Sequence, residues 1–322
     1  MRLQNFIFAK ILKSTIMEDM FKSKKGVPVW VQISFLLLWV GGIASLSALG
    51  AGDSSADASL SSLMTPSIIR LLIVFQAILV FFLPIVFFIF LLRQSGLSFL
   101  TLGKKPTLRW ILFGVLAMLA CFPLVSWTGE INSLIKLPSA FSGLENWMKS
   151  MENQSSNTSE ILLNDKSVLG LILNLLTIAF TAAFSEELFF RALLQQTLTK
   201  TKLNYHIGIW IAAFVFSAIH MQFYGFFPRL LLGAVLGYLF YYTGSIWVSI
   251  IAHFLNNAFV VVLGFFSGDN VNLNPLEKSK DELDVSFGWP LALMSFVLIF
   301  CLFFIMNKNF KKEQSDEMAS QV

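Results

Sequence analysis

The chain has 322 residues, of which 56% are hydrophobic and only 13% are charged, and its formal net charge is +4. Soluble domains contain about 25% charged residues, so this composition excludes an ordinary soluble protein and indicates an integral membrane protein. The lysines are scattered over loops without stacking aromatic residues beside them, which argues against a nucleic-acid-binding groove.

Apolar runs of about 20 residues predict eight membrane-spanning helices, so the expected fold is an all-α, polytopic membrane helix bundle. The spans are predicted at 29–49, 67–92, 109–128, 168–196, 207–223, 229–242, 245–266 and 288–306. The sixth span is short, and we expect it to be tilted or only partly inserted in the bilayer.

Lys and Arg residues between the predicted spans indicate the orientation of the chain. With both termini in the cytoplasm, the inner segments hold fifteen Lys and Arg, and the outer segments hold seven, among them Arg70 and Arg229. Since cytoplasmic loops are enriched in positive charge, we expect cytoplasmic N- and C-termini, in the plasma or inner membrane if the chain is bacterial.

The spans divide the chain into five segments. They are a basic N-terminal segment (1–28), three transmembrane helices with a polar outer loop at 129–167 (29–166), a core of four helices (167–266), an outer loop with the last helix (267–306), and a cytoplasmic tail (307–322). The tail is polar and charged, and we expect it to be disordered.

Apart from arginines at the span ends, which are counted with the flanking segments, ionisable side chains inside the predicted spans are few and fall in three places. An Asp, Lys or Arg at the bilayer centre costs about 2.5–3.5 kcal/mol, so such groups are candidates for function. The stretch "AFTAAFSEELFFRALL" (179–194) holds Glu186, Glu187 and Arg191. His220 lies in "FVFSAIHM" and His253 in "SIIAHFLNNAF".

The spacing within the first stretch divides the two carboxylates. Glu187 and Arg191 are four residues apart, so they share a helix face and can pair. Glu186 is rotated by about 100° from Glu187 and points elsewhere, which leaves it able to face a cavity and act as a general base. The two carboxylates are therefore expected to have different roles, one structural and one chemical.

The other two places show the same four-residue spacing. His253 shares a helix face with Asn257, and Phe216 shares one with His220. If the three faces converge, one carboxylate, two imidazoles and one carboxamide would lie close together. Such a set of groups can activate water and stabilise an oxyanion. Convergence requires the fourth span to continue to about residue 196, so that Glu186 lies near mid-depth.

Each of these features also has a structural interpretation when it is taken alone. An intramembrane histidine or asparagine can hydrogen-bond between helices, and Glu187 with Arg191 can form a structural clamp. Gly233 and Gly237 form a small-xxx-small pair that permits close helix contact, and we assign them no chemistry.

Taken in order, the three motifs resemble the CPBP family of intramembrane proteases. "EELFFR" fits Glu-Glu-x-x-x-Arg, "FSAIH" fits Phe-x-x-x-His, and "HFLNN" fits His-x-x-x-Asn. This family includes the type II CAAX prenyl endopeptidases and the bacteriocin-processing and immunity-type Abi proteins. The resemblance is strongest over about 170–265, so 167–266 would be a CAAX-protease-like catalytic core.

The resemblance implies roles for the matching residues. Glu186 would be the water-activating base, with His220 holding the water, while His253 and Asn257 would stabilise the oxyanion. Glu187 and Arg191 would orient the site, and Phe216 would line the substrate position. Members are named metalloproteases, so Glu186, His220 and His253 could hold a divalent metal such as zinc, although Glu186 and His220 could equally activate water without one.

The leading hypothesis is hydrolysis of a peptide bond in a membrane-associated or prenylated-protein-like substrate, with the lipid bilayer as the other partner. One alternative is a non-catalytic membrane protein that binds a peptide, as an immunity or scaffold factor would. A transporter with a proton relay is the third hypothesis. The chain shows no internal repeat of the kind common in transporters, which counts against it.

Overall fold

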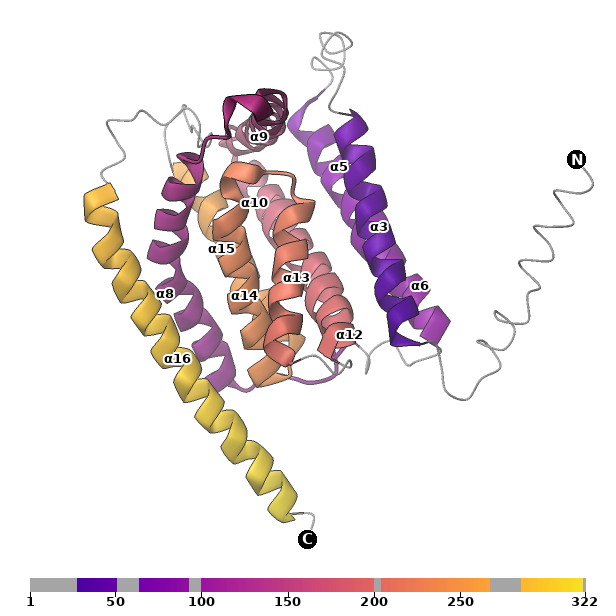
Figure 1. Ribbon diagram of the computed structural model, residues 1–322, viewed down its shortest axis with the longest axis vertical. Helices are drawn as coiled ribbons and strands as arrows, with labels where there is room; N and C mark the ends of the chain where they lie inside the picture. The colour runs from indigo at the N-terminus through magenta and orange to yellow at the C-terminus, as the bar shows by residue number, and fades with distance from the viewer. Residues whose placement is uncertain (1–27, 51–63, 93–99, 200–203, 267–284, 321–322) are drawn as a thin grey trace, which may run out of the picture.

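The protein is a bundle of helices, seen from the side in Figure 1. The computed structural model describes residues 28–50, 64–92, 100–199, 204–266 and 285–320. Every regular element in these ranges is helical, which confirms the expected all-α fold. The predicted N-terminal segment, except Pro28, and residues 267–284 of the predicted outer loop lie outside the described residues.

In the part of the chain that the structure describes, six helical stretches are long and apolar enough to cross a membrane, which makes this a multi-pass membrane protein. They are Pro66–Phe90, Leu108–Ser133, Val168–Thr199, Phe223–Thr243, Ile246–Phe266 and Gly288–Lys312. The first and fifth predicted spans coincide with shorter apolar helices, Trp30–Gly42 and Tyr205–Ile219. The sixth, predicted to be short, belongs to one of the six long stretches.

The elements follow one another without any strand between them in the described ranges. They are α3 (Val29–Gly50), α5 (Pro66–Ala77), η1 (Ile78–Phe82), α6 (Leu83–Leu92), α8 (Leu108–Ser133), η2 (Ser139–Phe141), α9 (Ser142–Leu163), α10 (Val168–Asn174), η3 (Leu175–Thr181), α11 (Ala182–Glu187), η4 (Leu188–Gln195), α12 (Gln196–Thr199), α13 (Tyr205–Ile219), η5 (Phe223–Gly225), α14 (Phe226–Thr243), α15 (Ile246–Phe266) and α16 (Val285–Ser320). The stretches η1, η3 and η4 are π-helical.

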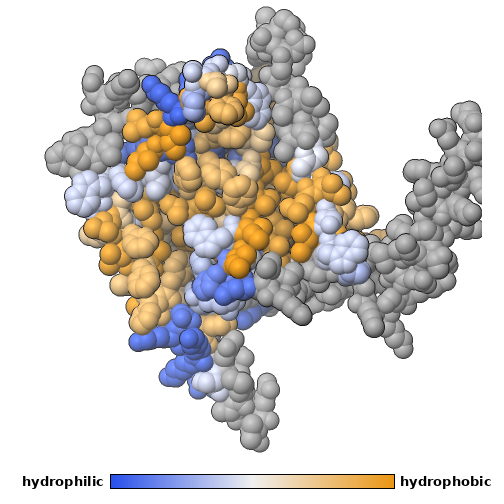
Figure 2. All heavy atoms as spheres, in the orientation of Figure 1, coloured by the Kyte–Doolittle hydropathy of each residue, from blue (hydrophilic) through white to orange (hydrophobic). Residues whose placement is uncertain are grey.

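The helices are arranged around α14 and the long helix that runs from α10 to α12. Helices α8 and α16 pack together on one side, α13, α14 and α15 fill the middle, and α3, α5 and α6 stand on the other side (Figure 1). Helix α9 lies at one end of the bundle. Hydrophobic side chains cover the middle of the face in Figure 2, and hydrophilic ones gather toward its two ends, as expected for a bundle solvated by lipid.

Local sequence sets where several helices begin and end. The Thr65 hydroxyl caps the start of α5, where Pro66 fits because the first turn needs no N–H donor from it. The Ser167 hydroxyl accepts from the Gly170 N–H at 2.9 Å and caps α10. Helix α14 ends at Gly244, whose φ of 59° lies in the left-handed region that glycine adopts without steric cost.

A proline inside α8 creates a contact with α16. Pro123 interrupts the hydrogen bonding of α8 because it has no N–H. The hydroxyl of Ser295 lies at this break, where it donates to the Ala120 carbonyl and accepts from the Leu124 N–H at 3.3 Å. The break in α8 is thus filled by a side chain from α16, which fixes the two helices against each other.

Glycines permit the close contact between α13 and α14, as their spacing predicts. A Cβ atom at Gly233 would lie 3.1 Å from the Phe216 ring and 3.2 Å from the Ala213 Cα. One at Gly237 would lie 2.8 Å from both Gln195 Oε1 and Ile209 Cγ2. The two glycines therefore bring α14 against α13 and against the helix that carries the two carboxylates.

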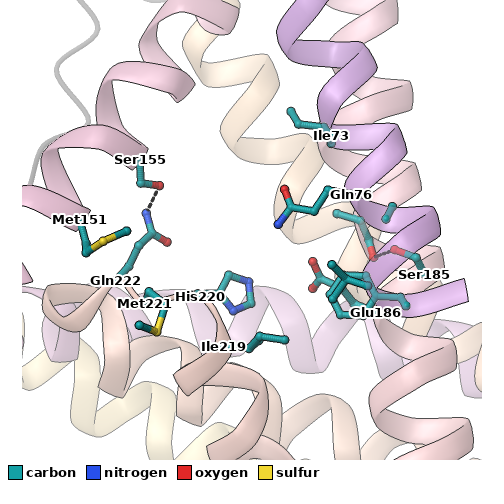
Figure 3. A pocket seen from close by; sticks show the side chains of 14 residues that line it. Ile73, Gln76, Met151, Ser155, Ser185, Glu186, Ile219, His220, Met221 and Gln222 are labelled. Carbon is teal, nitrogen blue, oxygen red and sulfur yellow. Dashed lines mark hydrogen bonds between the residues drawn. The ribbon is translucent and has the colours of Figure 1, made fainter. Parts of the chain in front are cut away.

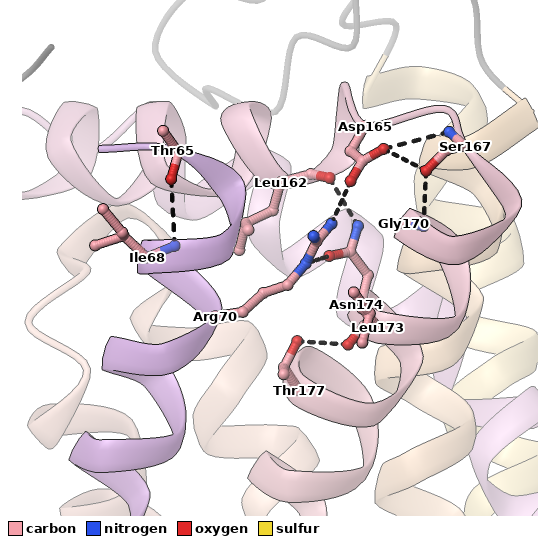
Figure 4. A network of polar contacts seen from close by, with 10 residues as sticks. All are labelled: Thr65, Ile68, Arg70, Leu162, Asp165, Ser167, Gly170, Leu173, Asn174 and Thr177. Carbon is pink, nitrogen blue, oxygen red and sulfur yellow. Dashed lines mark hydrogen bonds and ion pairs between the residues drawn. The ribbon is translucent and has the colours of Figure 1, made fainter. Parts of the chain in front are cut away.

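A buried arginine ties α5 to the start of that helix (Figure 4). Arg70 donates from Nε to Asn174 Oδ1 at 2.9 Å and from Nη2 to Asp165 Oδ2 at 2.7 Å. Asn174 in turn donates to the Leu162 carbonyl at 2.7 Å. The hydrogen bond from Arg70 holds the pKa of the Asp165 carboxyl below its usual value, with a further contribution from Ser167.

Three expectations from the sequence are corrected. The polar outer loop contains the 22-residue helix α9, and the tail expected to be disordered is helical to Ser320 because α16 continues through it. Arg70 and Arg229, counted with the outer segments, lie inside α5 and α14.

Candidate active site

The two adjacent carboxylates lie at the end of α11, between the π-helical stretches η3 and η4. Together these elements form one helix from Val168 to Thr199, so the fourth span continues past residue 196 as required. Short π-helical stretches within α-helices occur frequently at functional sites. Here they flank both carboxylates.

Glu187 is the structural centre of the site. Its side chain is fully buried, and Oε2 lies 3.1 Å from Nε of Arg191, the pairing that their spacing predicts. Its other oxygen, Oε1, lies 2.9 Å from Nδ1 of His253 on α15. Glu187 therefore joins its own helix to α15 and fixes the ring of His253.

Arg191 is buried almost completely, with 1% of its side chain exposed. Its Cζ lies 5.0 Å from the centroid of the Phe216 ring, close enough for a cation–π contact. Nη1 and Nη2 have no hydrogen-bond acceptor in the described part of the chain. The positive charge of the guanidinium is thus stabilised by one carboxylate, that of Glu187, and by the face of the Phe216 ring.

Glu186 faces a different direction from Glu187. Its Oε2 lies 3.9 Å from Nε2 of His253, and its side chain lines a cavity of about 260 Å³ among α5, η1, α9, α11 and the end of α13. We call this the Glu186 cavity. The separation of the two carboxylates expected from the helical rotation is therefore present.

His220 lies on the opposite wall of the Glu186 cavity (Figure 3). It closes the C-terminal end of α13, and its Nδ1 lies 2.7 Å from the Phe216 carbonyl, so Nε2 is the ring nitrogen left for a ligand. The chain turns sharply at Met221, a non-glycine residue with a φ of 56°. Such a left-handed conformation costs about 1–2 kcal/mol, and strain of this kind is typical of functional sites.

Phe216 lies between the histidines rather than on the cavity wall. Its ring is 5.1 Å from that of His220 and 5.8 Å from that of His253, with edge-to-face geometry in both pairs. It is 1% exposed and is not among the residues that line the Glu186 cavity. Its ring therefore contacts the two imidazoles and Arg191, and it also packs edge-to-face on Phe190 at 5.2 Å.

Asn257 lies one helical turn beyond His253 on α15. Its Nδ2 is 3.4 Å from the Ile178 carbonyl in η3, and its Oδ1 accepts from Asn256 at 3.1 Å. Neither Asn257 nor His253 lines the Glu186 cavity. The structure thus joins Glu186, Glu187, Arg191 and His253 by short contacts, with His220 across the cavity and Asn257 further along α15.

The placement of these side chains does not fit a zinc centre. A catalytic zinc ion takes three protein ligands. Within the described ranges, no three His, Cys, Asp or Glu side chains converge at a spacing that could hold a metal ion. The Nδ1 atoms of His220 and His253 are directed at the Phe216 carbonyl and the Glu187 carboxylate, which leaves only Nε2 of each ring to bind a ligand.

Two side-chain amides, of Gln76 and Gln222, also line the Glu186 cavity. They were not predicted as site residues because amides are not ionisable. Gln76 reaches the Glu186 cavity from α5 (Figure 3), and it is one of few polar residues in its span, which is the signal that could have identified it. Gln222 follows Met221, donates to the Ser155 hydroxyl of α9 and accepts from Arg229 at 2.7 Å. The loop that contains Gln222 gives no such signal.

Comparisons with known proteins bear on the same region. Residues 168–259 match a protein-family model described as type II CAAX prenyl endopeptidase Rce1-like. The uncharacterized protein YpbD of Bacillus subtilis (strain 168) is 32% identical to this chain over 80 residues. The match covers 24% of this chain and 38% of YpbD, so the chain spans well under half the length of that relative. No solved structure matches significantly.

Proposed function

Residues 168–259 form an Rce1-like type II CAAX prenyl endopeptidase (CPBP) domain, and from this premise we propose that the protein is an intramembrane endopeptidase. It hydrolyses a peptide bond with a water molecule activated by Glu186 and His220. The observation that carries the proposal is that these two side chains face one cavity inside the helix bundle.

In the proposed reaction, water lies between the Glu186 carboxylate and Nε2 of His220. Glu186 takes a proton as the water oxygen attacks the scissile carbonyl carbon, and the same proton then passes to the leaving amine. General acid–base catalysis of this kind contributes about 10²–10⁴-fold to a rate. Among the described residues, the donor side chains do not converge at metal-ligand spacing, so the proposed water activation uses Glu186 and His220 alone.

The positioning group is Glu187 with Arg191. Glu187 accepts from Nδ1 of His253, which directs the other ring nitrogen toward Glu186. We also propose that His253 and Asn257 stabilise the oxyanion. For this, the Asn257 amide must turn away from the Ile178 carbonyl. Gln76, already on the cavity wall, is a further amide able to donate there.

The substrate we propose is a membrane-associated peptide. Ile73, Val80 and Phe81 border the Glu186 cavity, so an apolar side chain or a prenyl group next to the scissile bond has a surface to pack against. We further propose eight crossings with both termini in the cytoplasm. In that orientation α9 lies at the outer face, and the peptide reaches the cavity from that side.

The test uses purified protein in lipid nanodiscs with quenched fluorescent peptides. Glu186→Gln and His220→Asn are each expected to lower the cleavage rate by about 10²-fold or more. His206→Asn is a matched control, because His206 lies at the other end of α13, where its Nδ1 is 2.7 Å from the Tyr238 hydroxyl. Glu145→Gln on α9 is the matched carboxylate control.

Both controls should retain the wild-type rate. Wild-type cleavage by Glu186→Gln or His220→Asn would refute the proposed mechanism. Peptide binding without cleavage in the wild type would instead support the non-catalytic alternative.

A further inference from the structure

A second cavity, of about 330 Å³, lies at the α9 end of the bundle among α8, α9 and the start of α14. We call it the Glu152 cavity. Glu130, Glu152, Ser156 and Arg229 are among the side chains that line it. The proposed reaction uses none of them.

The carboxylates of the Glu152 cavity lack close cationic partners. No Lys or Arg nitrogen of the described residues lies within 4.0 Å of Glu130 or Glu152. Glu152 is 4% exposed, and among the described residues only one of its oxygens accepts a hydrogen bond, from the Tyr224 N–H at 3.3 Å. Burial raises the pKa of the Glu152 carboxyl, and the opposing effects of the Arg229 charge and the Tyr224 N–H are smaller, so the carboxylate charge is only partly compensated.

Ser156 is a second, independent sign of a missing ligand. It is 5% exposed and lines the cavity, its hydroxyl makes no hydrogen bond with the described residues, and it is not one of the fully enclosed unpaired atoms, so it is open to the cavity. Buried hydroxyls are usually hydrogen-bonded. A ligand with N–H donors would satisfy both this hydroxyl and the free oxygen of Glu152.

Arg229 does not make the cavity a site for anions. Its Nη1 donates to Gln222 Oε1 at 2.7 Å, and its Nη2 donates to the Gln222 carbonyl. Its Nε is buried without a partner, so a ligand cannot reach it. An anion would have to displace Gln222 and approach two carboxylates, whereas a cation meets two carboxylates and the single positive charge of Arg229.

Gln222 connects the two cavities. Its side chain lines both the Glu186 cavity and the Glu152 cavity, and it is fixed between Ser155 and Arg229. A peptide whose scissile bond lies beside Glu186 therefore passes Gln222 if it extends along α9. The Glu152 cavity is the next space that its side chains meet.

We propose that the Glu152 cavity is a specificity subsite for a basic side chain, Lys or Arg, of the peptide substrate. The ammonium or guanidinium group binds between Glu130 and Glu152 and donates to Ser156. This subsite rests on the proposed function, because it assumes that a peptide occupies the Glu186 cavity.

The experiment measures binding rather than cleavage. Glu186→Gln protein in nanodiscs is titrated with fluorescent peptides in which one position at a time carries Lys, norleucine or Glu. At one position, Lys should bind about tenfold more tightly than norleucine, a difference of about 1.4 kcal/mol. Glu at the same position should bind more weakly than norleucine.

Carboxylate variants locate the effect. Adding Glu130→Gln and Glu152→Gln to the Glu186→Gln protein should abolish the preference for Lys, while Glu145→Gln should preserve it. Glu145 is the matched control because it lies on α9, pairs with Lys149 at 2.7 Å and does not line the cavity. Equal thermal unfolding of the variants shows that they fold.

Three results would overturn the subsite: no preference for Lys at any position, a preference that survives the two added Gln substitutions, or tighter binding of Glu than of Lys. The outcome is separable from that of the proposed function. Wild-type cleavage without a Lys preference removes only the subsite, and a Lys preference without cleavage removes only the protease.

Discussion

The buried pair of Glu187 and Arg191 offers the sharpest test of how this bundle holds charge. Both side chains are at most 1% exposed, and their closest atoms are 3.1 Å apart. With an effective dielectric constant of about 20, the attraction at that distance is about 5 kcal/mol. Removing one partner of a buried pair destabilises proteins by about 3–5 kcal/mol, because it leaves the other charge uncompensated.

Arg191→Met is therefore expected to lower the free energy of unfolding by about 3 kcal/mol, the lower end of that range, because Glu187 retains its contact with His253. On the scale of soluble domains of 150–250 residues, this corresponds to a fall in Tm of about 6–12 °C. The double variant Glu187→Gln/Arg191→Met removes both charges and should recover more than half of the loss.

The chain contains its own reporter for this measurement. Cys121 is buried at 1% exposure, whereas Cys301 is exposed. In a Cys301→Ser background, a thiol-reactive dye should label Cys121 only as the bundle unfolds, which gives Tm in detergent or nanodiscs. If Arg191→Met unfolds at the wild-type temperature, or if the double variant is no more stable than Arg191→Met, the charge-pair reasoning is wrong.

Two further predictions concern the contacts around the site. Asp165→Asn should remove part of the acid sensitivity of Tm. Arg70 lowers the pKa of Asp165 in the folded protein, so the contact contributes its full stability above the pKa that Asp165 has in the unfolded chain. That stability is lost as pH falls through the pKa of Asp165 in the folded protein. A Tm profile from pH 7 to pH 2 with the same slope in both proteins would contradict this. Gly233→Ala should lower Tm and the cleavage rate, because its Cβ would lie 3.1 Å from the Phe216 ring, whereas Gly143→Ala, with open space around its Cβ, should lower neither.

Hydropathy predicted most of the bundle because lipid selects for length and apolarity alone. The predicted span 168–196 lies within the observed helix Val168–Thr199, and 245–266 differs from Ile246–Phe266 by one residue. Helix α9 was missed because it is polar overall. Its apolar residues Leu144, Trp147, Met148 and Met151 nevertheless follow the i, i+3, i+4, i+7 pattern of an amphipathic helix.

The candidate site was predictable within each helix and less so between helices. The four-residue spacing of Glu187 and Arg191 fixes their pairing, since i and i+4 share a face. The contact between Glu187 and His253 joins residues 66 positions apart, and no local pattern specifies it. The tail was mispredicted because its charge indicates disorder, whereas the apolar turns of α16 before it have already nucleated the helix.

The π-helical stretch Leu188–Gln195 gives the site helix room for a change of length. Its i→i+5 hydrogen bonds accommodate about one residue more per turn than an α-helix does. Deleting one residue there would let the stretch relax to α-helix, and Glu187 and Gln195 would keep similar relative orientations because the wider turn had absorbed the extra residue. The Gln195 amide, which donates to the Gly237 carbonyl at 3.0 Å, would then keep its partner. Homologous chains should therefore differ by one residue in this segment more readily than in the α-helical turns of the same helix.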